Sequence, residues 1–156
     1  MILRSPAEFL QKPGSAKALQ AAAKLTEHQQ LWEVAQKALS SIDQAFAAKF
    51  TALAVTHCFQ GSPHIDKQNT AAFYGLALGD FPEGQGGIRV ECSSRIVAEV
   101  NTRNRLGKVD GRNPHWVAPY DEGCVRYSLI YYQTDGELAP VGPAIFATPG
   151  SSSEMC

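Results

Sequence analysis

Two patterns of hydrophobic and polar positions divide this chain at about Phe50. Before that point, from Ser15 to Lys49, the sequence is rich in Ala, Leu, Gln and Lys, which favour helices. Thr26 with Gln29 has the spacing of a capping box at a helix start. Apolar residues recur at spacings of three and four and mark one helix face: Trp32, Ala35, Leu39, Ile42 and Phe46. The pattern predicts one or two amphipathic helices that pack on the remainder of the chain.

After Phe50 the pattern changes to short β-type runs separated by turns. Two turns, over residues 79–87 and 108–114, are rich in Gly, Asp and Pro, which punctuate strands. The predicted strands are Phe50–His57, Ala72–Leu78, Gly87–Glu91, Ile96–Val100, His115–Val117 and Val125–Gln133. Many short strands at near-regular spacing predict a mostly β protein with N-terminal helices and a double-stranded β-helix core, of the jelly-roll or cupin-like kind.

This division predicts three parts within one domain of 156 residues. Residues 1–49 form a helical support segment, residues 50–134 the β core, and residues 135–156 an irregular tail. We expect Met1 to Leu3 and the serines Ser151 to Ser153 to be frayed.

Charge and cysteine usage narrow the function classes. The net charge of −1 and the pI near 6.4 give no global attraction for nucleic acid, so any such contact needs a local patch. The four cysteines form no CxxC pair and predict neither a zinc ribbon nor a thioredoxin-like site. No run resembles a signal peptide or a membrane span, which predicts a reducing intracellular compartment and no membrane partner. The oligomeric state stays open.

A candidate metal site comes from three residues: His64, Asp66 and His115. In an extended segment, residues two apart point to the same side, so His64 and Asp66 can face one metal. Two imidazoles and one carboxylate are the ligand set of a facial-triad iron(II) site, which keeps open positions for a cosubstrate and O2. The alternative is that His64 and Asp66 form a surface or capping pair and that His115 is a half-buried structural histidine.

A cation and a hydroxyl come after the second histidine. Strand alternation puts Arg126 and Ser128 on one face of the last strand. An inward Arg in an apolar strand is costly unless it is paired with an anion, and the distal carboxylate of 2-oxoglutarate is such a partner. The alternative is an ion pair with Asp121 or Glu122.

At these residues the chain resembles the iron(II)/2-oxoglutarate dioxygenases, and more narrowly the TET/JBP group. The resemblance covers roughly residues 50–133. It is carried by an HxDxxN form at residues 64–69, by Gly79-Asp80-Phe81 followed by Gly86-Gly87, and by Pro114-His115-Trp116-Val117 leading to Arg126-Tyr127-Ser128-Leu129.

The resemblance implies a chemistry and a substrate. It implies that Fe(II) and 2-oxoglutarate, or ascorbate as reductant or alternative cosubstrate, serve to oxidise the methyl group of 5-methylcytosine or thymine in DNA with O2. It implies that Asn69 contacts the target base, for which a turn-capping role is the alternative. Tyr74 and Trp116 are candidate stacking surfaces for an extruded base. A nuclear location is expected if the source is eukaryotic.

The chain also departs from that group. The cysteine-rich zinc-binding region of animal TET proteins is absent, and β-elements before Phe50 are hard to find. A basic stretch can border the active site or be a solvated loop: Arg95, Arg103, Arg105, Lys108 and Arg112. Two other functions remain open, namely a 2-oxoglutarate oxygenase of protein side chains or small molecules, and an inactive jelly-roll binding module.

Overall fold

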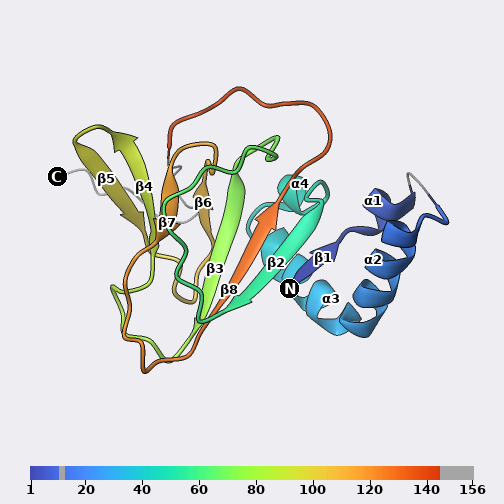
Figure 1. Cartoon of the computed structure of the whole chain (residues 1–156), viewed down its shortest axis with the longest axis horizontal. Helices are drawn as coiled ribbons and strands as arrows, with labels where there is room; N and C mark the ends of the chain where they lie inside the picture. Colours follow the sequence, from blue (N-terminus) through green and yellow to red (C-terminus); the bar gives the residue numbers. More distant parts are fainter. Residues whose placement is uncertain (11–12, 145–156) are drawn as a thin grey trace.

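The chain contains two antiparallel sheets in this computed structural model, which describes residues 1–10 and 13–144 (Figure 1). The larger sheet has the strand order β1-β2-β8-β3-β6, and the smaller has the order β5-β4-β7. The strands are β1 (Ile2–Arg4), β2 (Ala52–His57), β3 (Phe73–Gly79), β4 (Ile88–Ser93), β5 (Ile96–Val100), β6 (Gly107–Val109), β7 (His115–Val117) and β8 (Arg126–Tyr132). The prediction of a mostly β protein with N-terminal helices is therefore confirmed.

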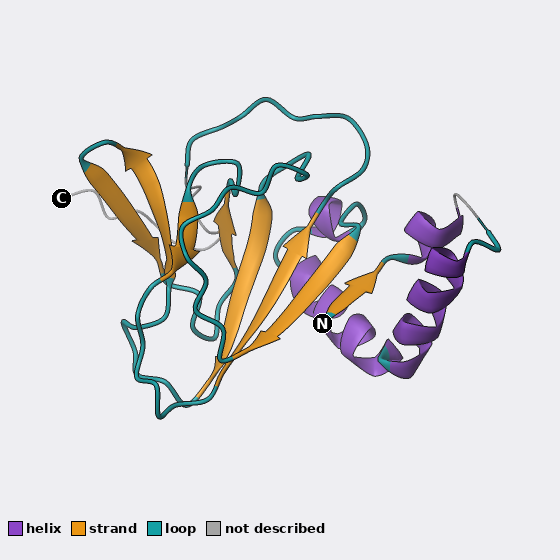
Figure 2. Cartoon of the chain, in the orientation of Figure 1, coloured by secondary structure: helices purple, strands orange, loops and turns teal. Residues whose placement is uncertain are grey.

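Helices gather at one side of the larger sheet (Figure 2). They are α1 (Pro6–Leu10), α2 (Ala16–Glu27), α3 (Gln29–Ser40) and α4 (Gln44–Ala47). Trp32 and Leu39 of α3 pack in one core with Leu53 and Tyr131 of the sheet. The apolar stripe thus does what the periodicity predicted, and its burial supplies most of the attachment between the helices and the sheet.

Strand register separates the two faces of the larger sheet. Leu53, Tyr131 and Tyr74 oppose one another across β2, β8 and β3 and face the helices. The next row, Ala54, Ile130 and Gly75, points to the other face, where a cavity lies between the two sheets. One face of the sheet therefore builds the core with the helices, and the other is available for a site.

The first residues do not fray. Ile2–Arg4 forms β1, which pairs antiparallel with β2 and places Leu3 opposite Leu53. The Leu3 side chain is 1% exposed, so its burial holds the strand in place. The expectation of a frayed start was wrong, and a β-element exists before Phe50.

Two helix predictions also need correction. Thr26 lies inside the last turn of α2, where its hydroxyl donates to the Ala22 carbonyl, so it does not open a helix. The hydroxyl that caps a helix here is that of Ser15, which accepts from the Ala18 amide. Ile42 is 41% exposed because α3 ends at Ser40, whereas Phe46 of α4 is buried in the same core as Trp32.

The strand predictions hold within a few residues, and β7 matches its predicted bounds. The exception is β6, which begins at Gly107 and runs into the segment predicted as a turn. The predicted tail is irregular up to Ala144, and its remainder, with Ser151 to Ser153, lies outside the described residues. Within the described ranges, no helix has the length and apolar character needed to cross a membrane.

Candidate metal centre

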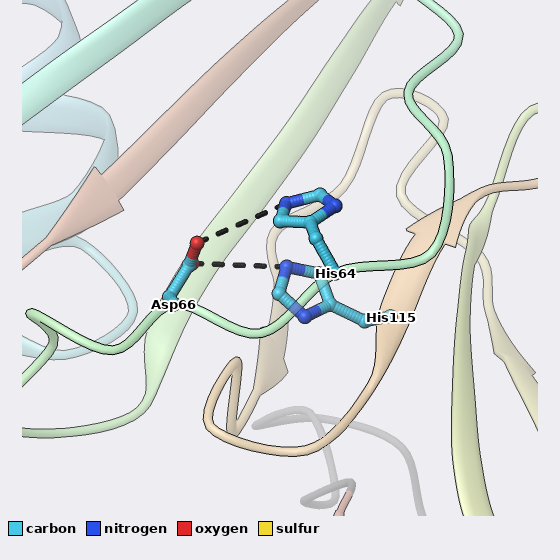
Figure 3. Close-up of side chains that lie close together, drawn as sticks. All are labelled: His64, Asp66 and His115. Carbon is cyan, nitrogen blue, oxygen red and sulfur yellow. Dashed lines mark ion pairs between the residues drawn. The ribbon is translucent and has the colours of Figure 1, made fainter.

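The three predicted metal ligands lie together (Figure 3), and all three line the cavity. Ligand atoms of His64, Asp66 and His115 all lie within 4.8 Å of one another. The Nε2 atom of His64 is 3.8 Å from Oδ1 of Asp66, and Nε2 of His115 is 3.7 Å from Oδ2. This group can bind a metal ion, and its composition is that of a 2-His-1-carboxylate site.

Backbone pairing explains how residues so far apart in sequence meet. The amide of His64 donates to the His115 carbonyl at 3.1 Å, and the amide of His115 donates to the His64 carbonyl at 2.9 Å. His115 lies on β7, in register with Val90 of β4. The Asp66 amide donates to the Gly111 carbonyl at 2.8 Å, which ties the loop that carries Asp66 to the turn before β7.

Both imidazoles are oriented by backbone carbonyls. Nδ1 of His64 lies 2.8 Å from the Ser62 carbonyl oxygen, and Nδ1 of His115 lies 3.0 Å from that of Asn113. Because a carbonyl oxygen only accepts, each Nδ1 carries the hydrogen, and in the neutral ring Nε2 is then the free ligand atom. Burial lowers the pKa of His115, although the Asn113 carbonyl and Asp66 act in the other direction. The neutral form that binds metals is favoured there.

The carboxylate of Asp66 is held from the protein side. Asn69, which is 5% exposed, donates from Nδ2 to Oδ2 of Asp66 at 3.0 Å. Gly111 packs against the same oxygen, since a Cβ there would lie 2.9 Å from it and 2.7 Å from the Phe73 ring. A side chain at position 111 would push the carboxylate out of place.

The cavity is lined both by His64, Asp66 and His115, here called the metal cluster, and by the predicted cosubstrate residues. Its volume is about 530 Å³, and Arg126 and Ser128 line it together with the three metal ligands. Ser128 opposes Thr56 of β2 and Ala77 of β3. At this row the larger sheet therefore contributes two hydroxyl-bearing side chains, those of Thr56 and Ser128, to the cavity wall.

Arg126 is buried and has no carboxylate partner among the described residues. It is 2% exposed, and it donates to the Gly86 carbonyl from Nε at 3.1 Å and from Nη2 at 2.6 Å. A third bond goes from Nη1 to the Ser128 hydroxyl. Within the described part of the chain, no ion pair joins Arg126 to Asp121 or Glu122, which was the alternative. Burial lowers the pKa of this guanidinium, as expected for a desolvated cation.

The three predicted substrate contacts lie in different places. Trp116 lines the cavity and is half-buried, and Asn69 lines it behind Asp66. Tyr74 points the other way, where its hydroxyl donates to Asp43 at 2.9 Å and its ring packs on Phe46. The structure therefore brings Trp116 and Asn69 to the cavity and leaves Tyr74 in the helix-facing core.

Most of the basic stretch is neutralised within the protein. The pairs are Arg103 and Arg105 with Glu83, Lys108 with Asp43, and Arg112 with Asp110. The pair of Arg112 and Asp110 is the most buried, with side chains 11% and 0% exposed. These residues serve the fold first, which favours the solvated or structural alternative over phosphate contacts.

Sequence reasoning missed two exposed apolar residues of the cavity. Phe59 and Ile65 line it and are 53% and 45% exposed. Their closeness in sequence to His64 was the available signal, because an apolar side chain next to a ligand in an irregular segment has no core to enter.

Comparison with protein-family models and with curated proteins finds no match for this chain.

Proposed function

We propose that this protein is an Fe(II)- and 2-oxoglutarate-dependent dioxygenase. The observation that carries the proposal is that a 2-His-1-carboxylate group lines one cavity with a buried arginine that has no carboxylate partner among the described residues. Either feature alone has structural explanations. Together they offer a metal and a dicarboxylate the ligands that each requires.

The donor set fits iron(II). Two neutral imidazoles and one carboxylate leave open positions on the metal, whereas a structural zinc site is closed by four protein ligands. Zinc is excluded by the chemistry of the proposed reaction, because it has no redox activity. When bound, iron and 2-oxoglutarate would supply the oxidative chemistry that turns 2-oxoglutarate, O2 and a substrate C–H group into succinate, CO2 and a hydroxylated product.

The same cavity offers hydrogen-bond partners for the cosubstrate's distal carboxylate. Arg126 would receive it with charge-assisted hydrogen bonds, and the Ser128 hydroxyl would add one more. The cosubstrate would then offset the desolvation cost of the buried cation. No carboxylate among the described residues does so. Ascorbate remains the alternative cosubstrate, and the buried arginine favours the dicarboxylate.

The two sheets would form the double-stranded β-helix of this enzyme class. The support is that two antiparallel sheets both contribute residues to the cavity that the metal ligands line. The small sheet contributes His115 through β7, and the loop before β3 contributes the other two ligands.

The substrate we propose is the methyl group of 5-methylcytosine or thymine in DNA. Its support is the sequence resemblance to the TET/JBP group together with the aromatic cavity residue Trp116. A nuclear location would be expected for a eukaryotic source. The ion pairs that neutralise the basic stretch favour a second candidate, a small molecule or protein side chain oxidised by the same centre.

The test is succinate release in air with Fe(II), 2-oxoglutarate and candidate substrates. Methylated oligonucleotides should give 5-hydroxymethylcytosine in step with succinate, and Asp66→Ala should abolish both. Succinate formed only with small molecules or peptides would move the substrate to the second candidate. The proposal would be contradicted if the folded wild-type protein made no succinate with any substrate and did not differ from its variants. The protein would then be a non-catalytic binding module.

A further inference from the structure

Asn69 touches the metal cluster through Asp66. Its side-chain amide donates to Oδ2 of Asp66 at 3.0 Å, and its backbone amide donates to the Asp66 carbonyl at 3.2 Å. The intervening residues form a turn. The turn therefore fixes Asn69 and Asp66 relative to each other by two independent bonds.

Burial limits what else Asn69 can contact. The residue is 5% exposed, whereas its neighbours Lys67 and Gln68 are exposed and also line the cavity. A group that reads a substrate edge needs polar atoms open to the cavity. Asn69 directs its amide to a carboxylate of the protein instead.

The two oxygens of Asp66 have different surroundings. Oδ2 accepts from Asn69, lies against Gly111 and is 3.7 Å from Nε2 of His115. Oδ1 receives no hydrogen bond from any described residue and lies 3.8 Å from Nε2 of His64. A carboxylate held in this way presents one oxygen to a metal more readily than both.

We propose that Asn69 is a positioning residue for the metal, which holds Asp66 as a one-oxygen ligand. The inference rests on the proposed function, because it assumes that the cluster binds a metal. With one oxygen from Asp66 and one nitrogen from each histidine, three positions of an octahedral ion stay open for a bidentate cosubstrate and O2. A two-oxygen Asp66 would occupy one of them.

The test is Co(II) binding, measured by titration and by the visible spectrum, in the wild type and in three variants. Asn69→Leu removes the amide with little change in size, and Asn69→Ala removes it with a smaller residue. Gln68→Leu is the matched control, because it also replaces a side-chain amide by an apolar group, at the exposed residue that precedes Asn69. Circular dichroism establishes that each variant is folded.

Loss of a partner behind a metal ligand typically weakens affinity by about 10- to 100-fold. We expect that loss for the Asn69 variants, with a changed Co(II) spectrum, and wild-type values for Gln68→Leu. Affinity and spectrum unchanged in a folded Asn69 variant would overturn the inference while leaving the metal site intact. A wild-type protein that binds no Co(II) would contradict the proposed function itself.

A second measurement needs no variant. In the wild type labelled with ¹⁵N, the side-chain amide signals of Asn69 should shift when diamagnetic Zn(II) binds, and those of Gln68 should not. Equal shifts for both residues, or none for Asn69, would count against the positioning role.

Discussion

The backbones of His64 and His115 exchange two hydrogen bonds, of 3.1 and 2.9 Å, so the loop that carries one ligand is paired antiparallel with the strand that carries the other. Both imidazoles are therefore placed before any ion arrives. A preformed site loses little conformational freedom on binding, which favours tight binding of the metal.

Metal binding should stabilise the fold. A ligand that binds only the folded state at a concentration of about 100 times its Kd adds about 2.7 kcal/mol to the free energy of unfolding. Chemical denaturation with and without Co(II) measures this increment. It should vanish in His64→Ala, whose exposed side chain is not needed for packing. An equal increment in that variant would indicate metal binding elsewhere.

Replacing Arg126 should separate the cosubstrate from the metal. Hydrogen bonds to charged groups contribute about 1.5–3 kcal/mol, so Arg126→Met should weaken 2-oxoglutarate binding by roughly ten- to hundredfold. Co(II) affinity should stay at its wild-type value, because Arg126 donates to Gly86 and Ser128 and to none of the metal ligands. Calorimetry under anaerobic conditions measures both. Unchanged 2-oxoglutarate affinity would place the carboxylate elsewhere.

The buried pair of Asp110 and Arg112 should govern acid stability. Burial alone would raise the pKa of Asp110, but hydrogen bonds from Arg112 and from the Gly142 amide hold it below its usual value. A carboxyl group whose pKa is lower in the folded state stabilises the fold at any pH above its unfolded pKa of about 3.9. This stabilisation is lost as the pH falls through the pKa of the folded state.

Breaking such a pair costs about 3–5 kcal/mol, so Asp110→Asn should lower the free energy of unfolding at pH 7 by that order. Urea denaturation from neutral to acid pH should show a smaller acid-induced loss in the variant than in the wild type. Parallel pH profiles would show that the pair does not control acid unfolding.

Tyr74→Phe should affect stability and leave turnover unchanged. The hydroxyl of Tyr74 donates to Asp43, which also pairs with Lys108, and the residue is 1% exposed. Removing one donor to a charged acceptor should cost about 1.5–3 kcal/mol. Trp116→Ala is the comparison, because Trp116 lines the cavity and its loss should raise KM. A raised KM in Tyr74→Phe would restore it as a substrate contact.

The features that depend on neighbouring residues in the sequence could be predicted. Alternation identified the strand of His115 and the shared face of Arg126 and Ser128, which the structure places in one cavity. The strand β1 could not be predicted, because three residues become a strand only through pairing with β2, far along the chain. The helix-facing position of Tyr74 depends likewise on register across the sheet.

The contact between Asn69 and Asp66 was within reach of the sequence. The two residues are three positions apart, and both Asp and Asn favour turns, which bring such residues together. The acidic partners of the basic stretch could not be predicted from the sequence, because Glu83 and Asp43 come from other segments. Long-range pairing of charges leaves no mark in one sequence.

The central claim is that one cavity holds iron(II) and 2-oxoglutarate together, and an anaerobic titration tests it most directly. Adding 2-oxoglutarate to the Fe(II)-loaded protein should produce the visible charge-transfer band of the chelate, with one equivalent at saturation. Asp66→Ala should give no band, and Arg126→Met should need a higher 2-oxoglutarate concentration to reach it. A folded, iron-loaded wild-type protein without that band at saturating 2-oxoglutarate would contradict the account.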